Sequence, residues 1–598
     1  MHETGHRVVD RCPPTYFRGM SETATEGEAP GTSLTASPSR GPLRVGLLVD
    51  SLVQPAWVVE AVRQIVRDGI AQIVCVVVNE AGESPVRQKL PALQRAARWM
   101  ENRHALAYAA YQRLDARRYP PARDPEAPED LAPVIGDSPL VIRVTPRMTR
   151  HCDYFPDEAV ARLREQSLDV LLRFGFRILK GDALSSARYG VWSFHHGDNT
   201  INRGGPAGFW EVMEGHQATG AVLQRLTEQL DAGHVIARSF AATEVLSFRR
   251  NRGKFYWIAA QLLPQALRRL RDEGPAQVEL PARWESYSQR LYVAPRTGEI
   301  IRLFLRLATR LVMRKARDVM QPEQWIVAYH FNKGMPAAND APDGVLYRFR
   351  EMLPPRDRIW ADPFPAVHEG RHYLFFEEKL NAAPRAHLSV TEIDEKGQAG
   401  PHRIVLERPY HLSYPHVFRW NGGWYMVPET YDVRRIELYR TDSFPDGWTL
   451  QSVLLDGVEA VDPTIFEHDG RWWLSFATSV PGTDEASALH FYHAPSPLGP
   501  WTPHCNNPVK VDVRSARPAG RVFHYEGRVY RPAQDGAPRY GTGIVVHELL
   551  ELTPTSFREV EVSRISATWR PGLTGTHTIS AAGGLTAIDA RQRRSRFR

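Results

Sequence analysis

The sequence contains little cysteine and no long hydrophobic run, and each absence excludes a class of protein. Four of its 598 residues are cysteine, and their scattered positions show neither metal-ligand spacing nor the density of a disulfide-rich domain. We therefore predict no metal site and a reducing compartment. No apolar segment reaches the length of a transmembrane helix, and the N-terminal residues lack the hydrophobic core of a signal peptide. These features predict a cytoplasmic protein.

The chain also has only a small excess of charge of one sign. Its formal net charge is +7 and its pI is about 9.1. This charge is too small to indicate a nucleic-acid-binding protein, and the sequence contains no recognition module for nucleic acid. It favours small anionic partners such as nucleotide sugars, folate glutamates or acidic lipids. The length allows two or three domains, each with its own core.

The first folded region is predicted to be α/β. Residues 1–42 are rich in Glu, Thr, Ser, Pro and Gly, and we expect them to be disordered. Residues 43–248 alternate apolar runs with helical stretches, which predicts a doubly wound, mostly parallel sheet. The expected strands are 44–49, 71–78, 140–144 and 168–174, and the expected helices are 55–67, 88–114 and 157–166.

One stretch of this region, residues 189–236, carries a motif with chemical content. It has a histidine at the end of a strand-like run, a glycine-containing loop, a Thr-Gly step that opens the next run, and an Asp-x-Gly turn. In order, these are His195, Arg203-Gly204, Thr219-Gly220 and Asp231-Ala232-Gly233. The histidine and the aspartate are 36 positions apart. The pattern resembles the formyltransferase family, which moves a formyl group from 10-formyltetrahydrofolate to an amine.

The resemblance implies a site for acyl transfer, which needs a donor to the developing oxyanion and a group that accepts the proton of the amine. His195 would be the oxyanion donor, Asp231 would hold it in its working protonation state, and Ser193 stands where the family has a catalytic asparagine. We expect 10-formyltetrahydrofolate as the formyl donor. Further residues expected to bind substrate or cofactor are His196, Asn199, Asn202, Arg203, Gly204, Thr219 and Gly233. The alternatives are a degenerate domain kept as a scaffold, or one that hydrolyses a formyl or acyl group.

Residues 249–325 form a predicted helical linker with an uneven distribution of charge. In the stretch 299–318, apolar side chains occupy one face, and arginines recur every fourth residue on another, at positions 302, 306, 310 and 314. Such a helix either docks between two domains or lies on an anionic membrane surface. We expect the docked arrangement, with Phe304, Leu307 and Leu311 buried, because apolar stripes usually face protein.

From residue 326 to 598 the sequence becomes rich in β-formers and aromatic residues, and it repeats. Each repeat begins at a proline and continues to a glycine followed by aromatic residues. The prolines are Pro363, Pro415, Pro463 and Pro518, spaced by 52, 48 and 55 residues, and a weaker fifth copy begins at His577. A period near 50 residues with several short strands in each unit is typical of propeller blades. The repeats therefore predict an all-β five-bladed propeller.

The repeats resemble two groups of proteins. The first is the five-bladed propellers of furanosidase-type glycoside hydrolases, and the second is the N-terminal domain of plant glucosamine inositolphosphorylceramide transferases. The segments that carry the second resemblance are 361–365, 376–378, 414–416, 427–430 and 531–535. It implies a carbohydrate-handling domain whose ligand binds over the central axis.

The blade starts and the ends of neighbouring strands supply the polar residues expected at this axis. They are Asp362, Glu378, His416, Glu429, Asp462, Arg517, Asp535 and His577. Two carboxylates across a sugar ring are what glycoside hydrolysis requires. Arg517 stands where the furanosidase pattern has its general acid, and an arginine there suits an anionic group. The alternative is structural, because Asp-Pro pairs also form good turns.

The combined prediction is a formyltransferase-like enzyme of surface-glycan biosynthesis that modifies a nucleotide- or lipid-linked amino sugar. One alternative is a glycosyltransferase or glycosidase-like enzyme that works in the propeller, beside a degenerate first domain. Another is a non-catalytic glycan-binding protein. A position at the inner face of the membrane, in peripheral contact with anionic lipid, is the alternative to a purely cytoplasmic location. The sequence leaves the acceptor and the oligomeric state open.

Overall fold

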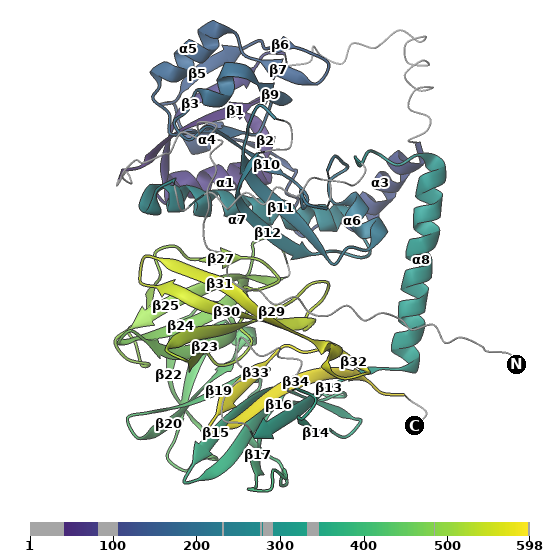
Figure 1. Ribbon diagram of the computed structural model, residues 1–598, viewed down its shortest axis with the longest axis vertical. Coiled ribbons are helices and arrows are strands. Elements are labelled where there is room, and N and C mark those ends of the chain that lie inside the picture. Colours follow the sequence, from purple (N-terminus) through teal and green to yellow (C-terminus); the bar gives the residue numbers. More distant parts are fainter. Residues whose placement is uncertain are drawn as a thin grey trace, which may run out of the picture.

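The computed structural model describes residues 41–81, 106–201, 203–229, 233–275, 278, 291–331, 346–483 and 485–595. Most of the segment expected to be disordered, residues 1–40, lies outside these ranges, as do Asn202 and Asp231 of the first predicted site. An α/β module and an all-β module stack along the long axis of the molecule (Figure 1). Within the described ranges, no helix has both the length and the hydrophobicity needed to cross a membrane.

The α/β module contains a seven-stranded sheet in the order β12-β11-β10-β8-β1-β3-β5. The five strands from β10 to β5 are parallel to their neighbours, and β11 and β12 continue the sheet in antiparallel fashion. The chain adds β3 and β5 on one side of β1 and then β8 and β10 on the other, so the strand order reverses between β1 and β8. The strands are β1 (Leu43–Val49), β3 (Ala71–Asn79), β5 (Leu140–Val144), β8 (Val170–Arg173), β10 (Val191–His195), β11 (Ala218–Arg225) and β12 (His234–Ala242).

Helices cover both faces of this sheet. On one face, α1 (Ala56–Arg67) and α7 (Phe248–Glu273) bury aliphatic and aromatic side chains against the strands. On the other face, α5 (Asp157–Glu165) packs on Leu48, Val77 and Leu171. The smaller elements are β2 (Val53–Pro55), α3 (Leu106–Arg118), β4 (Pro128–Asp130), α4 (Ala132–Ile135), β6 (Arg147–Met148), β7 (Cys152–Tyr154), β9 (Ile178–Lys180), η2 (Gly181–Ser185) and α6 (Phe209–Glu214).

The second module is a five-bladed propeller, as the repeats predicted. Five antiparallel sheets follow one another around an axis. Four of them are continuous in sequence. Their strands are β15 (Arg358–His368), β16 (Arg371–Leu380), β17 (His387–Ile393) and β18 (Arg403–Leu406); β19 (Ser413–Trp420), β20 (Gly423–Glu429), β21 (Arg435–Thr441) and β22 (Thr449–Asp456); β23 (Val461–His468), β24 (Arg471–Ser479), β25 (Ala486–Ala494), β26 (Thr502–Pro503) and β27 (Lys510–Val511); and β28 (Phe523–Tyr525), β29 (Arg528–Asp535), β30 (Gly543–Leu552) and β31 (Phe557–Ser566).

The fifth blade is assembled from segments that are far apart in the chain. It combines β13 (Glu323–Phe331) and β14 (Arg350–Met352) with β32 (Leu573–Gly575), β33 (Ile579–Ala582) and β34 (Leu585–Arg593). β13 pairs with β34 over its whole length, from Glu323 opposite Arg593 to Phe331 opposite Leu585. This pairing closes the ring, and the weak fifth repeat in the sequence is weak because it supplies only part of a blade.

The glycine that recurs in each repeat has a simple backbone reason. It follows a residue in the left-handed region, and both residues form the turn between the first two strands of a blade. Two consecutive positive φ angles define the type I′ turn, which matches the twist of a hairpin and favours glycine at its second position. The four pairs are Glu369-Gly370, Asn421-Gly422, Asp469-Gly470 and Glu526-Gly527, with φ between 47° and 79°.

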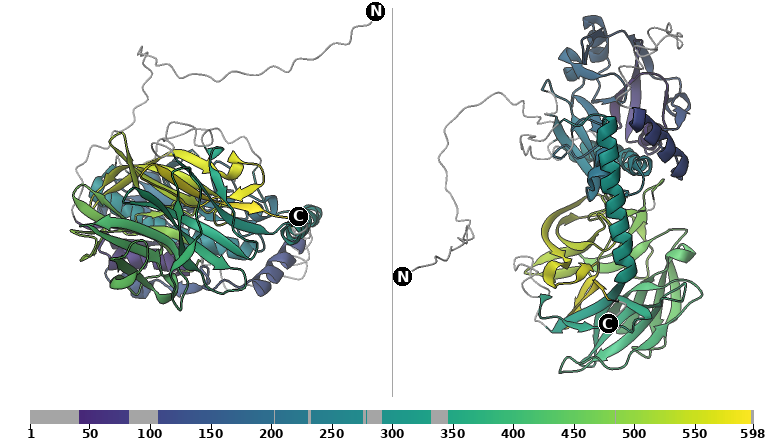
Figure 2. Two further views of the ribbon diagram at one scale, coloured as in Figure 1. Left: turned by 90° about the horizontal axis from the view of Figure 1, so that it is seen from below. Right: turned by 90° about the vertical axis from the view of Figure 1, so that its right-hand side faces the viewer.

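Helix α8 (Thr297–Met320) joins the two modules and runs beside both of them (Figures 1 and 2). Its first half buries Ile300, Leu303 and Leu307 in a cluster with α3 and α6. The expected burial therefore holds for Leu307, whereas Phe304 and Leu311 are only partly buried. Only one face of the helix is therefore docked against the α/β module.

The modules also contact each other directly. The guanidinium of Arg514 lies 3.4 Å from the ring centroid of Phe240 in β12, and the amide of Val513 donates to the carbonyl of Phe240 at 3.0 Å. Lys254 of α7 forms an ion pair of 2.7 Å with Glu485 of the propeller. The α/β module consequently covers one end of the propeller.

Candidate functional site

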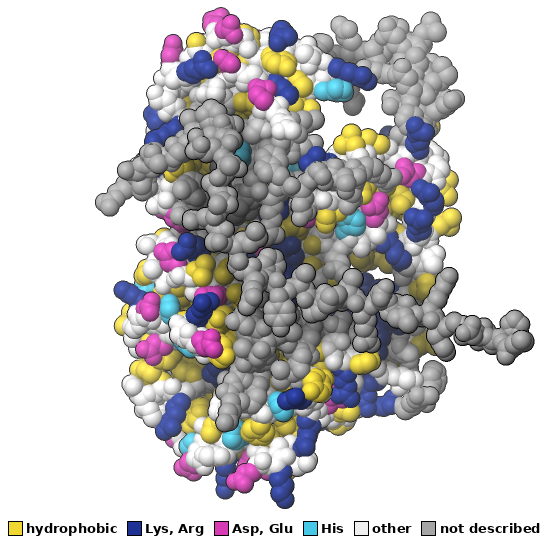
Figure 3. Space-filling model, in the orientation of Figure 1, with side chains coloured by type: hydrophobic (Ala, Val, Ile, Leu, Met, Phe, Trp, Pro, Cys, Tyr) yellow, Lys and Arg dark blue, Asp and Glu magenta, His cyan; other side chains and the backbone are white. Residues whose placement is uncertain are grey.

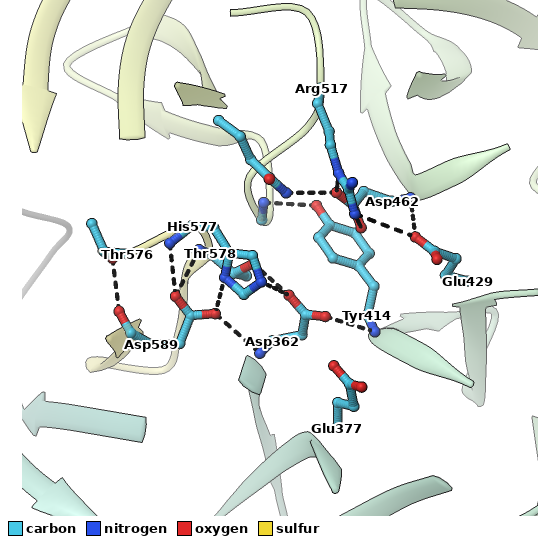
Figure 4. Close-up of polar contacts among 12 residues, drawn as sticks. Asp362, Glu377, Tyr414, Glu429, Asp462, Arg517, Thr576, His577, Thr578 and Asp589 are labelled. Carbon is cyan, nitrogen blue, oxygen red and sulfur yellow. Dashed lines mark hydrogen bonds and ion pairs between the residues drawn. The ribbon is translucent and has the colours of Figure 1, made fainter. Parts of the chain in front are cut away.

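Three blades turn a polar side chain toward the propeller axis by the same backbone device. Asp362, Tyr414 and Asp462 each precede a proline in the first strand of their blade, and their φ angles are 49°, 48° and 52°. The strand register shifts at each of these positions. A left-handed residue in a bulge re-aims its side chain, at a cost in backbone strain for any residue other than glycine. The same backbone conformation occurs in three blades, and it brings three side chains together at the propeller axis (Figure 4).

Asp362 lies at the centre of one half of this axial cluster. Its carboxylate accepts hydrogen bonds from the Thr578 hydroxyl at 2.6 Å and from the Tyr414 amide at 3.3 Å. The Nε2 atom of His577 lies 3.7 Å from it. The backbone amide of Asp362 donates to Asp589 at 3.2 Å. Asp362 is therefore held by residues from two other blades, the second and the fifth.

His577 is enclosed by carboxylates and aromatic rings. Its Nδ1 atom forms an ion pair with Asp589, and its ring stacks on Trp325 with 4.2 Å between centroids. Burial opposes the charged form of the imidazole, but Asp589 and Asp362 outweigh it and raise the pKa of His577. This histidine therefore favours the imidazolium form beside two carboxylates.

Asp462 is at the centre of the other half. It accepts hydrogen bonds from Arg517 Nε at 2.5 Å and from Gln534 Nε2 at 2.6 Å. Its own amide donates to Glu429 Oε2 at 3.0 Å. The guanidinium of Arg517 also lies 4.7 Å from the ring centroid of Tyr540. Arg517 thus balances the charge of Asp462 and leaves Glu429 with a weaker contact of 3.7 Å.

Burial changes the protonation of several carboxyl groups in the cluster. Loss of water, reinforced by the charge of Asp462, raises the pKa of Glu429 to about 8. Burial likewise raises the pKa of Asp362 to about 6 and raises the pKa of Glu377 well above its ordinary range. At neutral pH, Glu429 therefore carries a proton and Asp362 is mostly ionised. Carboxyl groups that are driven to different protonation states are typical of acid–base sites.

The raised pKa of Glu429 predicts a pH-dependent effect of the Glu429→Gln substitution on stability. The unfolded chain releases this proton near pH 4.5, whereas the folded chain keeps it up to about pH 8. The folded parent therefore loses stability relative to the unfolded state as the pH rises through this interval. Glutamine stays neutral, so we expect the melting temperature of the variant, relative to the parent, to rise between about pH 5 and about pH 9. A difference in melting temperature that does not change with pH would contradict the protonated state of Glu429.

A pocket lies over this cluster, between the two modules. Its volume is about 310 Å³, which is within the range of small-molecule sites. Arg517, Gln534 and Tyr540 line it on the propeller side. The remaining charged lining residues are Glu244 and Lys254 of the α/β module, Arg314 of α8, and Glu485 and Arg539 of the propeller. The site is therefore composite, and both modules contribute to it.

Five of the eight residues expected at the axis are brought together: Asp362, Glu429, Asp462, Arg517 and His577. The other three are placed elsewhere. His416 is buried against Phe364 and Phe418.

Glu378 and Asp535 are one residue away from positions that face the axis. Glu378 accepts hydrogen bonds from Arg358 at 2.8 Å and from Ser389 at 2.7 Å within its own blade. Asp535 pairs with Arg564 at 2.8 Å. Successive residues of a strand point to opposite faces of the sheet. The axial positions are therefore taken by the preceding residues, Glu377 and Gln534.

Several members of the cluster were not predicted from the sequence, although some have a detectable signal there. Tyr414 occupies the same pre-proline position as Asp362 and Asp462, and its hydroxyl contacts Thr464 at 2.8 Å and accepts from the Gly520 amide at 2.6 Å. The pairing of Glu377 with Ala361 matches that of Glu429 with Ser413, so their equivalence follows from register. Asp589 and Tyr540 follow no repeated pattern.

The first predicted site, in the α/β module, is only partly described. His195 ends β10, half-buried, at the carboxyl end of a parallel strand. Ser193 is buried, and its hydroxyl accepts a hydrogen bond from Arg173 Nε at 3.1 Å. Ser193 therefore helps to hold Arg173, and its expected catalytic role stays a prediction. Asp231 and Asn202 lie outside the described residues.

The residues expected to bind substrate around His195 mostly have structural partners. His196 sits among Trp57, Phe194, Phe255 and Tyr256, and burial lowers its pKa to about 3. The neutral imidazole therefore packs within an aromatic cage, and its expected role in binding stays a prediction.

Other residues that were expected to bind substrate also have partners within the protein. Asn199 accepts a hydrogen bond from Arg238 at 3.1 Å. The hydroxyl of Thr219 is fully buried between Thr243 and Asn251. Among the loop residues, Arg203-Gly204 lies against the backbone of Tyr292, and Gly233 lies against the carbonyl of Arg225.

The propeller matches a described family. Residues 353–572 match the model described as glucosamine inositolphosphorylceramide transferase 1, N-terminal. The enzyme of that name from Arabidopsis thaliana is 38% identical over 206 residues, which are 34% of this chain and 27% of the relative. The chain thus spans less than a third of the length of the curated relatives it matches. The matched segment contains every axial residue named above except His577, Thr578 and Asp589.

Two solved structures align with parts of the chain at low sequence identity. Zg3597, a family 117 glycoside hydrolase from Zobellia galactanivorans, is 14% identical and aligns with 45% of this chain and 90% of its own, with a TM-score of 0.30. Glycinamide ribonucleotide transformylase 1 from Symbiobacterium toebii is 15% identical and aligns with 39% of this chain and 89% of its own, with a TM-score of 0.25.

Proposed function

We propose that the chain is a carbohydrate-active transferase and that its reaction takes place at the propeller axis, below the pocket between the modules. The observation that carries this proposal is the pairing of Glu429 with Asp462. Burial keeps a proton on Glu429, and Arg517 balances the charge of Asp462 directly beside it. The relatives matched over the propeller are named as transferases of glucosamine, which supports the same class of reaction.

Glycosyl transfer needs an acid where the leaving oxygen departs and a base where the new hydroxyl attacks. Glu429 has the proton that the first role requires, and 11% of its side chain is exposed, compared with 1% for Asp462. We assign Glu429 as the acid. Asp462 then orients Glu429 through its amide and holds Arg517 in place. Asp362, which is ionised above about pH 6, is our candidate for the base.

The pocket suits a sugar that carries an anionic group. Arg517, Arg314 and Arg539 reach it from three segments, and Tyr540 offers an aromatic surface beside them. Guanidinium groups bind phosphate through paired donors, and aromatic rings pack on the apolar faces of sugars. We propose a phosphate-bearing sugar or a phosphorylated sugar alcohol as the substrate class.

Thermal-shift and product assays on the full chain test the proposal. We expect nucleotide-linked amino sugars or inositol phosphates to raise the melting temperature, because a ligand that binds only the folded state stabilises it. We also expect transfer of the sugar to an inositol phosphate acceptor, detected by mass spectrometry. Binding without any product would instead identify a glycan-binding protein. Release of free sugar regardless of the acceptor would identify a hydrolase.

Formyl transfer at His195 is a second candidate, and one observation favours it. His195 stands at the carboxyl end of β10, beside the strands where the order of the sheet reverses, and open α/β sheets bind ligands at this edge. We propose 10-formyltetrahydrofolate as the donor and an amino sugar as the acceptor. Formyl transfer that is lost in His195→Ala, and retained when the neighbouring His196 is replaced by Phe, would support this site. No transfer by the parent chain would leave the α/β module as a cover for the propeller pocket.

A further inference from the structure

Helix α8 exposes a continuous apolar stripe. Ile301, Leu305, Val312 and Val319 are 55%, 65%, 67% and 52% exposed. Their spacings of four, seven and seven residues place them on one side of a helix with 3.6 residues per turn. The buried residues of α8 described above lie on the opposite side, against α3 and α6. The apolar face expected from the sequence is therefore divided, and only one edge of it is covered by protein.

The charged residues of α8 around this stripe are mainly basic. Residues 300–317 contain no acidic side chain and six basic ones. One of these, Arg310, donates to the carbonyls of Val212 and Met213. Arg302 and Arg306 are exposed and flank the stripe. Glu214 and Glu299 lie near its first turns, and Asp318 near its end pairs with Arg593. An exposed helix surface with bulky apolar residues and mainly cationic neighbours complements an anionic, partly apolar environment.

The position of α8 leaves this stripe accessible. The helix forms one edge of the molecule along its long axis, and it lies in front of both modules when that side faces the viewer (Figure 2). Lys and Arg side chains are visible along the same edge in the space-filling view (Figure 3). Two further apolar residues just before the helix, Leu291 and Val293, are also exposed. The helix of 24 residues is about 36 Å long, so the stripe offers an extended line of contact.

We propose that α8 docks the protein on an anionic lipid bilayer, with the stripe between the headgroups and the flanking arginines on lipid phosphates. A second copy of the chain fits this surface poorly, because it would place another mainly cationic helix, with six basic residues between 300 and 317, against the first. Long arginine side chains reach outward from such a position while their methylene groups remain near the apolar layer. The proposal is independent of the reaction at the propeller axis.

Vesicle co-sedimentation of the full chain without any sugar ligand tests this. We expect binding to vesicles of equal parts phosphatidylcholine and phosphatidylserine, and little binding to phosphatidylcholine alone. Arg302→Glu/Arg306→Glu should lower the partition coefficient roughly 10-fold or more at low salt, because each cation near an anionic surface contributes to binding. Leu305→Ser/Val312→Ser should lower binding comparably, and this loss should persist at high salt.

Matched controls replace exposed residues of the same chemical types on the propeller. Leu450→Ser/Val453→Ser changes an exposed apolar pair on β22, and Arg371→Glu/Arg528→Glu reverses two exposed arginines. Both controls should bind as the parent does, and all variants should keep the parent melting temperature. Parent-like binding by the α8 variants would overturn the proposal. So would light scattering that shows a dimer dissociated by Leu305→Ser/Val312→Ser, which would assign the stripe to a second copy.

Discussion

Glu429→Gln should slow sugar transfer by about 10²–10⁴-fold while leaving sugar binding intact. Glutamine has the size of the protonated glutamic acid that the buried site holds at neutral pH, and its carbonyl oxygen can still accept the amide of Asp462. It cannot give up a proton to a leaving oxygen. The expected result is a fall in kcat with an unchanged dissociation constant, measured by steady-state kinetics and by calorimetry.

The nearby Glu378 offers a control for this result, because it is also buried and acidic but bonds within its blade. Glu378→Gln should lower stability and leave kcat per folded molecule near that of the parent. Equal kcat for the parent and Glu429→Gln would remove Glu429 from the chemistry. A loss of binding equal to the loss of rate would mean that this residue only holds the ligand.

Glu559→Gln should cost about 3–5 kcal/mol of folding free energy, because it removes one partner of a buried ion pair. Glu559 accepts two hydrogen bonds from Arg531, each of 2.8 Å, and another of 2.6 Å from Lys510. The Arg531 side chain is fully buried, so the substitution leaves its charge uncompensated in the interior of a blade. Denaturant titration followed by tryptophan fluorescence should show an earlier unfolding transition of the propeller.

The exposed pair Arg434–Glu459, at 2.8 Å, is the matched control, and Glu459→Gln should cost only about 0–1 kcal/mol. The pH dependence gives a second check. Arg531 and Lys510 overcome burial and hold the pKa of Glu559 well below its ordinary value. The stability that this carboxylate supplies is present above pH 4.5 and is lost as the pH falls further. The difference in the free energy of unfolding between the parent and Glu559→Gln should therefore decrease as the pH is lowered. A difference that increases at low pH would contradict the ionised state of Glu559.

Local sequence signals were sufficient for most of the architecture. The proline marks the inward bulge in three repeats, and the glycine marks a type I′ hairpin in four, so four blades could be predicted from the sequence. The fifth blade could not, because β13 and β34 pair across more than two hundred residues, and no local pattern encodes such a pairing. The division of the α8 apolar face was also hidden, since it depends on where α3 and α6 lie.

The candidate site was predictable where a polar residue begins a blade. Asp362 and Asp462 were expected at the axis for this reason, and the same position in the second blade holds Tyr414. Glu378 was expected at the axis, but Glu377 lies there. A shift of one residue along a strand reverses the face to which a side chain points. The expected ligand residue Thr219 lies in a buried hydrogen-bond network with Asn251, which no local pattern predicted. The pocket itself was not predictable, because its walls come from α7, α8 and separate propeller loops.

The pairing of β13 with β34 has a consequence for biosynthesis. The strand that starts the propeller must wait for the strand at 585–593 before the ring is complete, so the blades made first remain an open arc during translation. Throughout this interval, β13 has an unpaired edge that includes Val327 and Tyr329, both buried in the finished ring. Such an edge is a template for pairing with other chains. We therefore expect nascent chains that stop before residue 585 to aggregate, and chaperone demand to fall once β34 has emerged from the ribosome.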